Sequence, residues 1–164
     1  MANPYRSTVT IDGTKFDAVS TQVVFATAKD RAGMPEMGSL RTKIRVWGDF
    51  HDDTNLPNAS LKKFFELANV VTREKIKDIK IEFWKDDSHQ DALCSYKFKG
   101  WISNFETSNP PTANGGGAAV ASGPIGGDGA AVATAAAPGL NHLLVLDLEP
   151  VLNQQNFSEI AISN

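Results

Sequence analysis

Residues 79–83 read Ile-Lys-Ile-Glu-Phe, and residues 101–105 read Trp-Ile-Ser-Asn-Phe. In the first run apolar and charged side chains alternate at a period of two, which predicts a strand with one buried face. Turn-forming residues follow at 86–88, and the stretch 93–105 then alternates in return. The two runs therefore predict an antiparallel hairpin. Gly100 interrupts the second run, and we expect a β-bulge there.

The same alternation predicts further strands on both sides of this hairpin. They are expected at 7–11, 16–20, 21–28, 41–49 and 144–148, with a short last strand around 157–162. The pair Asp12-Gly13 favours positive φ and predicts that the chain begins with a hairpin. Pro150 cannot donate a backbone hydrogen bond, so we expect the run before it to lie at an edge or a bulge.

Between Thr54 and Val71 the apolar period changes from two to 3.6, which predicts a helix over about 58–71. Its apolar stripe comprises Leu61, Phe64, Phe65, Ala68 and Val71. We expect the two adjacent phenylalanines to plug the open end of a sheet or barrel. Asn55, Asn58 and Ser60 are all possible N-caps, and the sequence does not choose among them.

Short antiparallel strands around one helix predict a mainly β fold, a small antiparallel β-barrel with one flanking α-helix. The length of 164 residues fits a single domain, 1–164. Within it, a Gly/Ala-rich insert spans 110–139, where 18 of 30 residues are Gly or Ala and Asp128 is the only charge. Such a segment buries too little apolar area to order itself, although it could line a cavity or pack between subunits.

The long loop at 29–40 contains two glycines and a proline, which break any regular pattern, and two methionines. It is either an ordinary surface loop or an arm whose methionines dock on another subunit. Trp47 lies between cations on one face of the strand 41–49; that face is either covered by a neighbour or shielded by the cationic stems. We expect subunit contacts at Asp30, Arg31, Met34, Pro35, Glu36, Met37, Trp47 and Trp84, with the methionines and tryptophans exposed as anchors.

Charge and composition argue against several classes of protein. The net charge is −3 and the chain has no basic run, so nucleic acid is not an expected partner. The single cysteine, Cys94, is expected to be a small buried apolar residue and not a nucleophile. Neither a signal peptide nor an apolar run of about 20 residues is present, so we expect no membrane insertion and synthesis in the cytoplasm.

Chemistry-bearing residues are few. The stretches 51–53 and 86–91 offer Asp and His ligands, but both lie at turns, where such residues form local hydrogen bonds. The glycine clusters lack the Lys-Ser or Lys-Thr pair of a phosphate loop, and no nucleophile elbow occurs. A dispersed triad would need His51, His89 or His142. We therefore expect no enzyme activity, no cofactor and no metal.

The succession of hairpin, long loop, strand, helix, the hairpin of 79–83 and 101–105, Gly-rich loop and final Leu-x-Leu-x-Leu strand resembles the hemolysin-coregulated protein (Hcp) family. Members are inner-tube subunits of type VI secretion, related in fold to tail-tube proteins of contractile phages. The resemblance implies a β-barrel flanked by one helix. It also implies six-membered rings joined edge to edge and stacked head to tail, with the loop at 29–40 reaching the next ring. The insert at 110–139 is longer than the family's usual loop.

A tube subunit of this kind implies a homo-oligomer whose further partners are sheath, spike and cargo effector proteins. It would assemble in the cytoplasm and be exported without a signal peptide. The long insert leaves open a different contractile injection system or a self-standing filament. A small-ligand-binding β-barrel, with Phe64, Phe65 and Trp84 as pocket walls, is the rival class. A metal-dependent enzyme is third.

Overall fold

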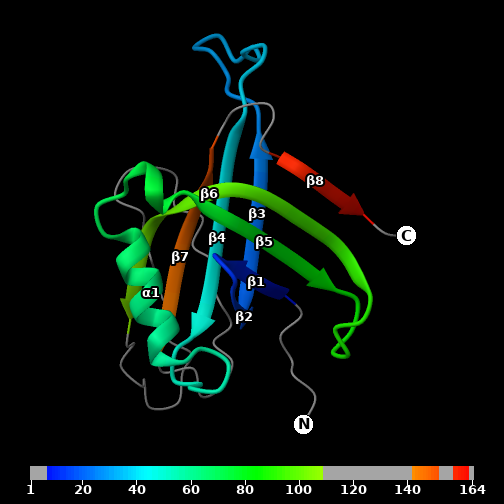
Figure 1. The fold of residues 1–164 in the computed structure, drawn as a ribbon. Helices are drawn as coiled ribbons and strands as arrows, with labels where there is room; N and C mark the ends of the chain where they lie inside the picture. Colours follow the sequence, from blue (N-terminus) through cyan, green and yellow to red (C-terminus); the bar gives the residue numbers. More distant parts are fainter. Residues whose placement is uncertain (1–6, 109–141, 152–156, 163–164) are drawn as a thin grey trace, which may run out of the picture.

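A computed structural model describes residues 7–108 and 142–151, and the backbone of residues 157–162. In these residues the fold is mainly β with one α-helix, as predicted (Figure 1). The strands are β1 (Ser7–Ile11), β2 (Thr14–Ala18), β3 (Ser20–Ala26), β4 (Arg41–Asp49), β5 (Lys77–Trp84), β6 (Ala92–Ser108), β7 (Leu143–Pro150) and β8 (Phe157–Ile162). The helix α1 (Asn58–Ala68) precedes a short 3₁₀ turn, Arg73–Lys75.

All described strand pairs are antiparallel and belong to one sheet of order β2-β1-β5-β6-β7-β4-β3, with β8 paired to β6. The 17-residue strand β6 joins the two halves of this sheet. Its first half pairs with β5 up to Gly100, and its second half pairs with β7 from Gly100 onward. The hairpin predicted from 79–83 and 101–105 is therefore present, but its second strand extends far beyond β5.

The hydrogen-bond ladder does not close into a complete barrel, because β2 and β3 are the two ends of the sheet order. Only Val19 separates these strands, and its N–H donates to the carbonyl oxygen of Trp47 at 2.8 Å. A single linking residue is too short for a hairpin turn, so β2 and β3 follow one another without pairing. Side chains bridge the rolled sheet instead: Phe25 on β3 meets Tyr96 on β6 with ring centroids 5.9 Å apart.

The first turn follows the sequence prediction. Asp12 and Gly13 both have positive φ, 49° and 75°, as a two-residue turn between twisted antiparallel strands requires. The turn after β5 is also built as expected, since the Ser88 N–H donates to the Asp86 carboxylate at 3.0 Å. Local residues thus define both turns, although the strands of both hairpins also contribute side chains to the main core.

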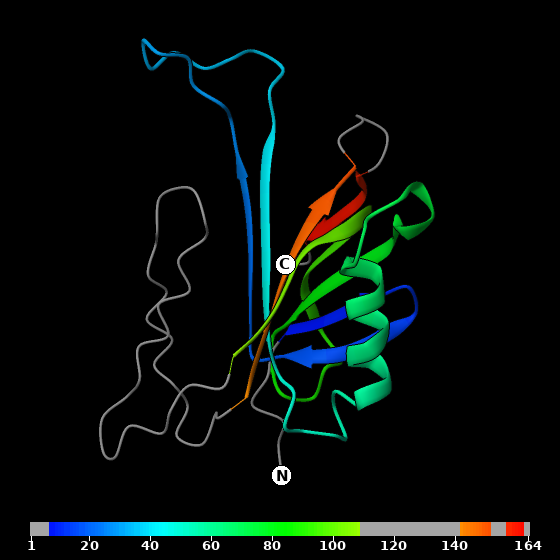
Figure 2. The same ribbon diagram turned by 90° about the vertical axis from the view of Figure 1, so that its left-hand side faces the viewer.

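One main core lies between α1 and the sheet, and Figure 2 shows the helix on one side of the sheet with the β3–β4 hairpin extending beyond it. Phe64 is fully buried and meets Phe16 with ring centroids 5.4 Å apart. The strands contribute mostly branched aliphatic side chains from alternate positions. The largest fully buried ones among them are Val9, Ile11, Ile44, Val46, Ile79, Ile81, Ile102, Leu144, Leu146 and Leu148.

The predicted apolar stripe of the helix is partly wrong. Phe64 is buried, but Phe65 is 52% exposed and meets only the edge of Phe105. Adjacent residues in a helix point about 100° apart, and here the helix is turned so that Phe64 and not Phe65 faces the centre of the core. The helix also ends earlier than expected, because Val70 adopts a left-handed φ of 53°.

None of the three candidate residues caps this helix. The N-cap is Pro57, which makes no side-chain cap hydrogen bond. Asn55 instead binds the backbone of Asp17 on β2, accepting from its N–H at 2.7 Å and donating to its carbonyl at 2.8 Å. The amide thus occupies the outer edge of β2 as a neighbouring strand would.

The predicted bulge is displaced by three residues. Gly100 is paired on both sides, whereas the register of β6 against β7 shifts at Ser103, between Ile102 and Asn104. Glycine at position 100 has a different cause: a Cβ there would collide with the carbonyl oxygen of Glu149. The residue permits close approach of two backbones.

The expected edge position of the last Leu-rich strand is also wrong, because β7 lies between β6 and β4. Pro150 is its final residue, and pairing with β4 has already stopped at Leu148. A missing N–H costs little at such a strand end. The Gly/Ala-rich insert predicted at 110–139 lies outside the described residues.

Replacing Phe64 with Ala should lower the free energy of unfolding by about 3–5 kcal/mol, because it empties the centre of the helix–sheet core. The matched variant Phe65→Ala should cost less than about 1.5 kcal/mol, since its ring has only an edge contact. Urea denaturation measures both values. Equal losses would contradict the assignment of the buried face.

Replacing Gly100 with Ala should cost roughly 1–3 kcal/mol, because the added methyl group meets backbone that cannot rotate away. Gly48 is the control: a Cβ there lies 3.5 Å from the nearest atom, on Leu56, which is ordinary contact. The melting temperatures of the Gly100→Ala and Gly48→Ala proteins measure the two losses of stability. A Gly100→Ala protein as stable as Gly48→Ala would show that the two strands can separate without loss.

Candidate docking surface

The most prominent surface feature is the segment 27–40, which joins β3 to β4 and is here called the arm. It extends beyond the rest of the sheet at one end of the molecule (Figure 2). Nearly all of its side chains are exposed, but Ala28 is buried within it. The loop predicted at 29–40 is thus present as a projection.

Hydrogen bonds give the arm a defined shape. The Asp30 carboxylate accepts from the N–H groups of Ala32 and Met34, both at 2.9 Å. Across the base of the arm the Glu36 N–H donates to Ala28 at 2.8 Å, and the Ala28 N–H donates to the Ser39 hydroxyl at 3.0 Å. These bonds fold the arm on itself without help from the sheet.

Two glycines complete this shape. Gly33 and Gly38 have φ values of 82° and 78°, in the region that other residues avoid. The Asp30 carboxylate is occupied by the bonds just described, so it stabilises the arm from within. An arm ordered in advance loses little conformational entropy when it binds a partner.

The arm presents apolar side chains to solvent. Met34 is 62% exposed and Met37 is 92% exposed, as the sequence predicted. Leu40 is also exposed, as are Val24 and Phe25, which lie on opposite faces of β3. Unbranched thioether side chains adapt to irregular surfaces, which is why exposed methionines are common at binding surfaces.

The expected exposure of Trp47 is wrong. Its side chain is 3% exposed and packs in a second small core with Leu143 and Val145, against which Val19 is also packed. Trp47 and Val145 are register partners on β4 and β7, which explains their contact. Trp47 therefore offers almost no area to a neighbouring subunit.

Trp84 is half-buried and is held by its own chain. Its indole N–H donates to the Thr8 hydroxyl at 2.8 Å, and its ring stacks on His89 with centroids 5.3 Å apart. The Thr8 hydroxyl in turn donates to Asp17 at 2.7 Å. The exposed part of Trp84 remains a predicted contact, but Trp84 is not a free anchor.

An ion pair links β4 to β7 on the sheet face that also carries Trp47. Arg45 binds Asp147 through two parallel hydrogen bonds, Nε to Oδ1 at 2.6 Å and Nη2 to Oδ2 at 2.9 Å. The bond to Asp147 raises the pKa of Arg45 above its ordinary value, against the effect of burial. The pair holds the register of two strands that the chain joins only over a long distance.

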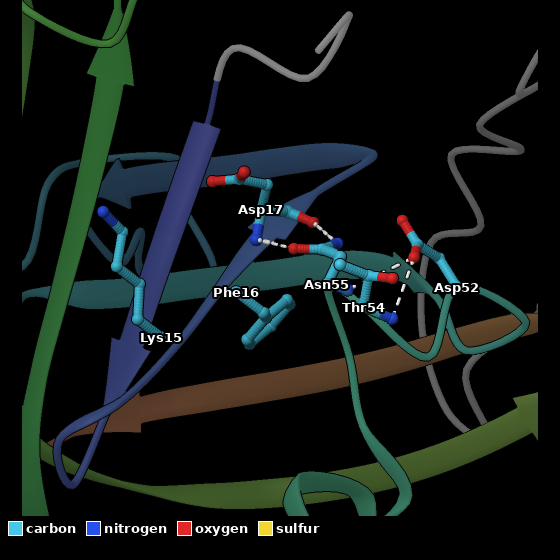
Figure 3. A pocket seen from close by; sticks show the side chains of 6 residues that line it. All are labelled: Lys15, Phe16, Asp17, Asp52, Thr54 and Asn55. Carbon is cyan, nitrogen blue, oxygen red and sulfur yellow. Dashed lines mark hydrogen bonds between the residues drawn. The ribbon is translucent and has the colours of Figure 1, made fainter.

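Beyond the end of β4 that lies away from the arm, residues 52–55 and β2 line an open hollow of about 400 Å³, here called the base hollow. Figure 3 shows its lining residues. It is lined by Lys15, Phe16, Asp17, Asp52, Thr54 and Asn55. The Asn55 amide bonds to Asp17, described above, form one wall, and the N–H groups of Thr54 and Asn55 bind Asp52 Oδ1 at 3.1 and 3.2 Å. The hollow is thus an open depression with both polar and apolar lining.

The three histidines named as candidates lie in two different places. His51 and His142 lie near each other, with ring centroids 5.4 Å apart, while His89 stacks on Trp84. Within the ranges that the structure describes, no three His, Cys, Asp or Glu side chains are placed to hold a metal ion. Cys94 is half-buried; its hydrogen bond with Tyr96 and burial raise the pKa of Tyr96 to about 12.

The helix α1 has only 11 residues, and the described part of the chain contains no helix that could cross a membrane.

Comparisons with known proteins identify the fold. No family model matches the chain, and no curated protein matches it by sequence. Hcp1 from Flavobacterium johnsoniae matches with a TM-score of 0.54 and 12% identity, over 89% of this chain and 90% of that one. A second Hcp protein matches with a TM-score of 0.53 and 10% identity, over 88% and 86%.

The sheath/tube terminator of an extracellular contractile injection system, PVC, matches with a TM-score of 0.50 and 16% identity, over 99% of this chain and 96% of that one. The chain therefore has an Hcp-like fold of the tail-tube kind, and at these identities the likeness shows the fold alone. The fold expected from the order of elements is confirmed.

Replacing Asp30 with Ala should loosen the arm alone, since it removes the acceptor of two backbone hydrogen bonds. The amides of Ala32 and Met34 should exchange with solvent roughly tenfold faster, which corresponds to about 1.4 kcal/mol of local stability. Asp30→Asn keeps one acceptor oxygen and should show a smaller effect. If hydrogen exchange were the same in all three proteins, the carboxylate would not hold the arm.

Proposed function

We propose that this chain is a structural, non-catalytic subunit that forms rings and stacks them head to tail into a hollow tube. The rings are hexameric, and the tube belongs to a type VI secretion system or a related contractile injection system. The observation that carries the proposal is the ordered arm with two exposed methionines on an Hcp-like fold. A side chain as apolar as Met37 gains little from projecting into solvent and gains free energy when a second copy covers it.

The two ends of the sheet support a directional contact between copies. The β2 edge is occupied at Asp17 by the Asn55 amide, whereas β3 is the other terminal strand of the sheet order. β3 also exposes Val24 and Phe25, apolar side chains that a monomeric edge strand would normally avoid. Unlike edges favour heterologous contacts, which produce rings or filaments and not simple twofold dimers.

The interface residues proposed on the arm are Asp30, Arg31, Met34, Pro35, Glu36 and Met37. Arg31, Pro35 and Glu36 are exposed beside the methionines, and the internal bonds of Asp30 keep this group in one arrangement. Half-buried Trp84 adds a smaller contact. Apolar side chains surrounded by charges of both signs are typical of a specific protein interface.

In this proposal the activity is mechanical. The tube assembles in the cytoplasm, is exported without a signal peptide, and meets sheath, spike and cargo effector proteins as partners. The full burial of Phe64 in the main core supports this assignment over a ligand-binding barrel, because that side chain is part of the packing and not a pocket wall.

Electron microscopy of the purified protein should show rings and stacked tubes, and deletion of residues 33–38 should leave single rings. The deletion removes the exposed methionines while leaving the strands intact. Met34→Ser with Met37→Ser is the matched control that keeps the arm's backbone, and it should weaken stacking to a smaller degree.

Discrete monomers at high protein concentration would overturn the proposed function. Unaltered tubes after the deletion would refute the docking role of the arm but not ring formation. Tubes released by cells that lack a sheath would indicate a self-standing filament. A protein that stays monomeric and gains melting temperature with a small molecule would indicate the ligand-binding class.

A further inference from the structure

We propose that the arm of one copy docks in the base hollow of a copy in the adjacent ring, with Glu36 facing Lys15 and Arg31 facing Asp52. This inference rests on the proposed function, and it names the receptor surface that head-to-tail stacking requires. It assigns a role to a hollow that is open to solvent in the single subunit.

The placement of the two surfaces is the first argument. β4 begins at the arm and ends at Asp49, just before the segment that supplies Asp52, Thr54 and Asn55. β2, which supplies the other wall, directly precedes the start of β3. The arm and the segment that follows Asp49 therefore lie at opposite ends of β4, a nine-residue strand of about 30 Å (Figures 1 and 2). The residues that line the base hollow include three from that segment. In a head-to-tail stack along this hairpin, the arm of one copy would face the hollow end of the next.

Charge complementarity is the second argument. The arm exposes a cation, Arg31, and an anion, Glu36. The hollow has Lys15 and Asp52 on opposite sides of Phe16 (Figure 3). Ion pairs in the described part of the chain involve none of these four residues. The arm also exposes Lys29 and Asp30, and Asp17 also lines the hollow. The carboxylates of Asp30 and Asp17 already accept hydrogen bonds within their own chain. Pairing of Glu36 with Lys15 and of Arg31 with Asp52 would favour one orientation between rings.

Hydrogen bonds within the single subunit already order both surfaces before they meet. The Asp52 Oδ1 atom already binds two amides, so the carboxylate has a set orientation toward the hollow. The hydrogen bonds of Asp30 set the arm in the same way. The Lys15 stem and the flexible methionines supply apolar contact around the charges. Little ordering is then needed on binding, and weak ion pairs suffice when repeated around a ring.

Charge reversal at Lys15 and Glu36 tests the pairing. Neither side chain makes a described hydrogen bond or ion pair, so K15E and E36K should keep the melting temperature of the wild type. Each single variant should raise the critical concentration for tube growth roughly three- to tenfold, because like charges then meet in every contact. The double variant K15E/E36K should return it to near the wild-type value. Sedimentation of tubes measures the critical concentration, and negative-stain images confirm that single rings persist.

Lys62→Glu is the control for K15E, since it makes the same change of net charge on an exposed helix position outside both surfaces. It should leave the critical concentration unchanged. An equimolar mixture of K15E and E36K rings should also stack, because alternating rings restore opposite charges at each contact; this measurement supports the pairing even if the double variant folds poorly.

Rings that stack normally in both single variants, or a double variant and a mixture that both fail to recover, would overturn the docking in the base hollow. Either result would leave the proposed function intact, because rings would still form. A wild-type protein without rings would instead remove the proposed function and this inference together.

Discussion

The pairing of β6 with three other strands is the constraint on which the rest of the structure depends. Its first half belongs to the ladder with β5, its second half to the ladder with β7, and β8 pairs beside the first half. Gly100 lies where these ladders meet, and only a residue without Cβ lets the β7 backbone approach there. The bulge at Ser103 then turns the second half of the strand, so that inward positions continue from Ile102 to Phe105.

This arrangement determines which surfaces are left for other molecules. Because β7 pairs with β4, the β3–β4 hairpin is attached along the far side of the sheet and its tip is free to project. The same topology leaves β3 at the sheet's end and brings Asn55 to the edge of β2. The arm and the base hollow are thus consequences of one strand order. Both are ordered by side-chain bonds to backbone, from Asp30 at one end and from Asn55 and Asp52 at the other.

Sequence patterns correctly predicted features that depend on residues close together in the chain. They failed to predict features that depend on contacts between strands far apart in the chain. Alternation located the strands closely, and β4 has the predicted bounds. The exposure of Met34 and Met37 was also predicted correctly, because glycine and proline indicated an irregular loop outside the core. By contrast, burial of Trp47 depends on Leu143 and Val145, about a hundred residues away, so its own strand could not reveal it. The base hollow was missed for the same reason, because no short motif signals that Asn55 will bind β2.

The sequence by itself determined the mainly β class, the helix, the hairpin turns and the projecting loop. Each follows from a period or a turn pair within about ten residues, where local sterics and solvation act without knowledge of the fold. Only the tertiary structure decided that Phe64 and not Phe65 enters the core, that β7 is interior despite Pro150, and that the ladder stays open between β2 and β3. Those outcomes depend on which strands meet, and strand pairing is set by contacts between residues far apart in the chain.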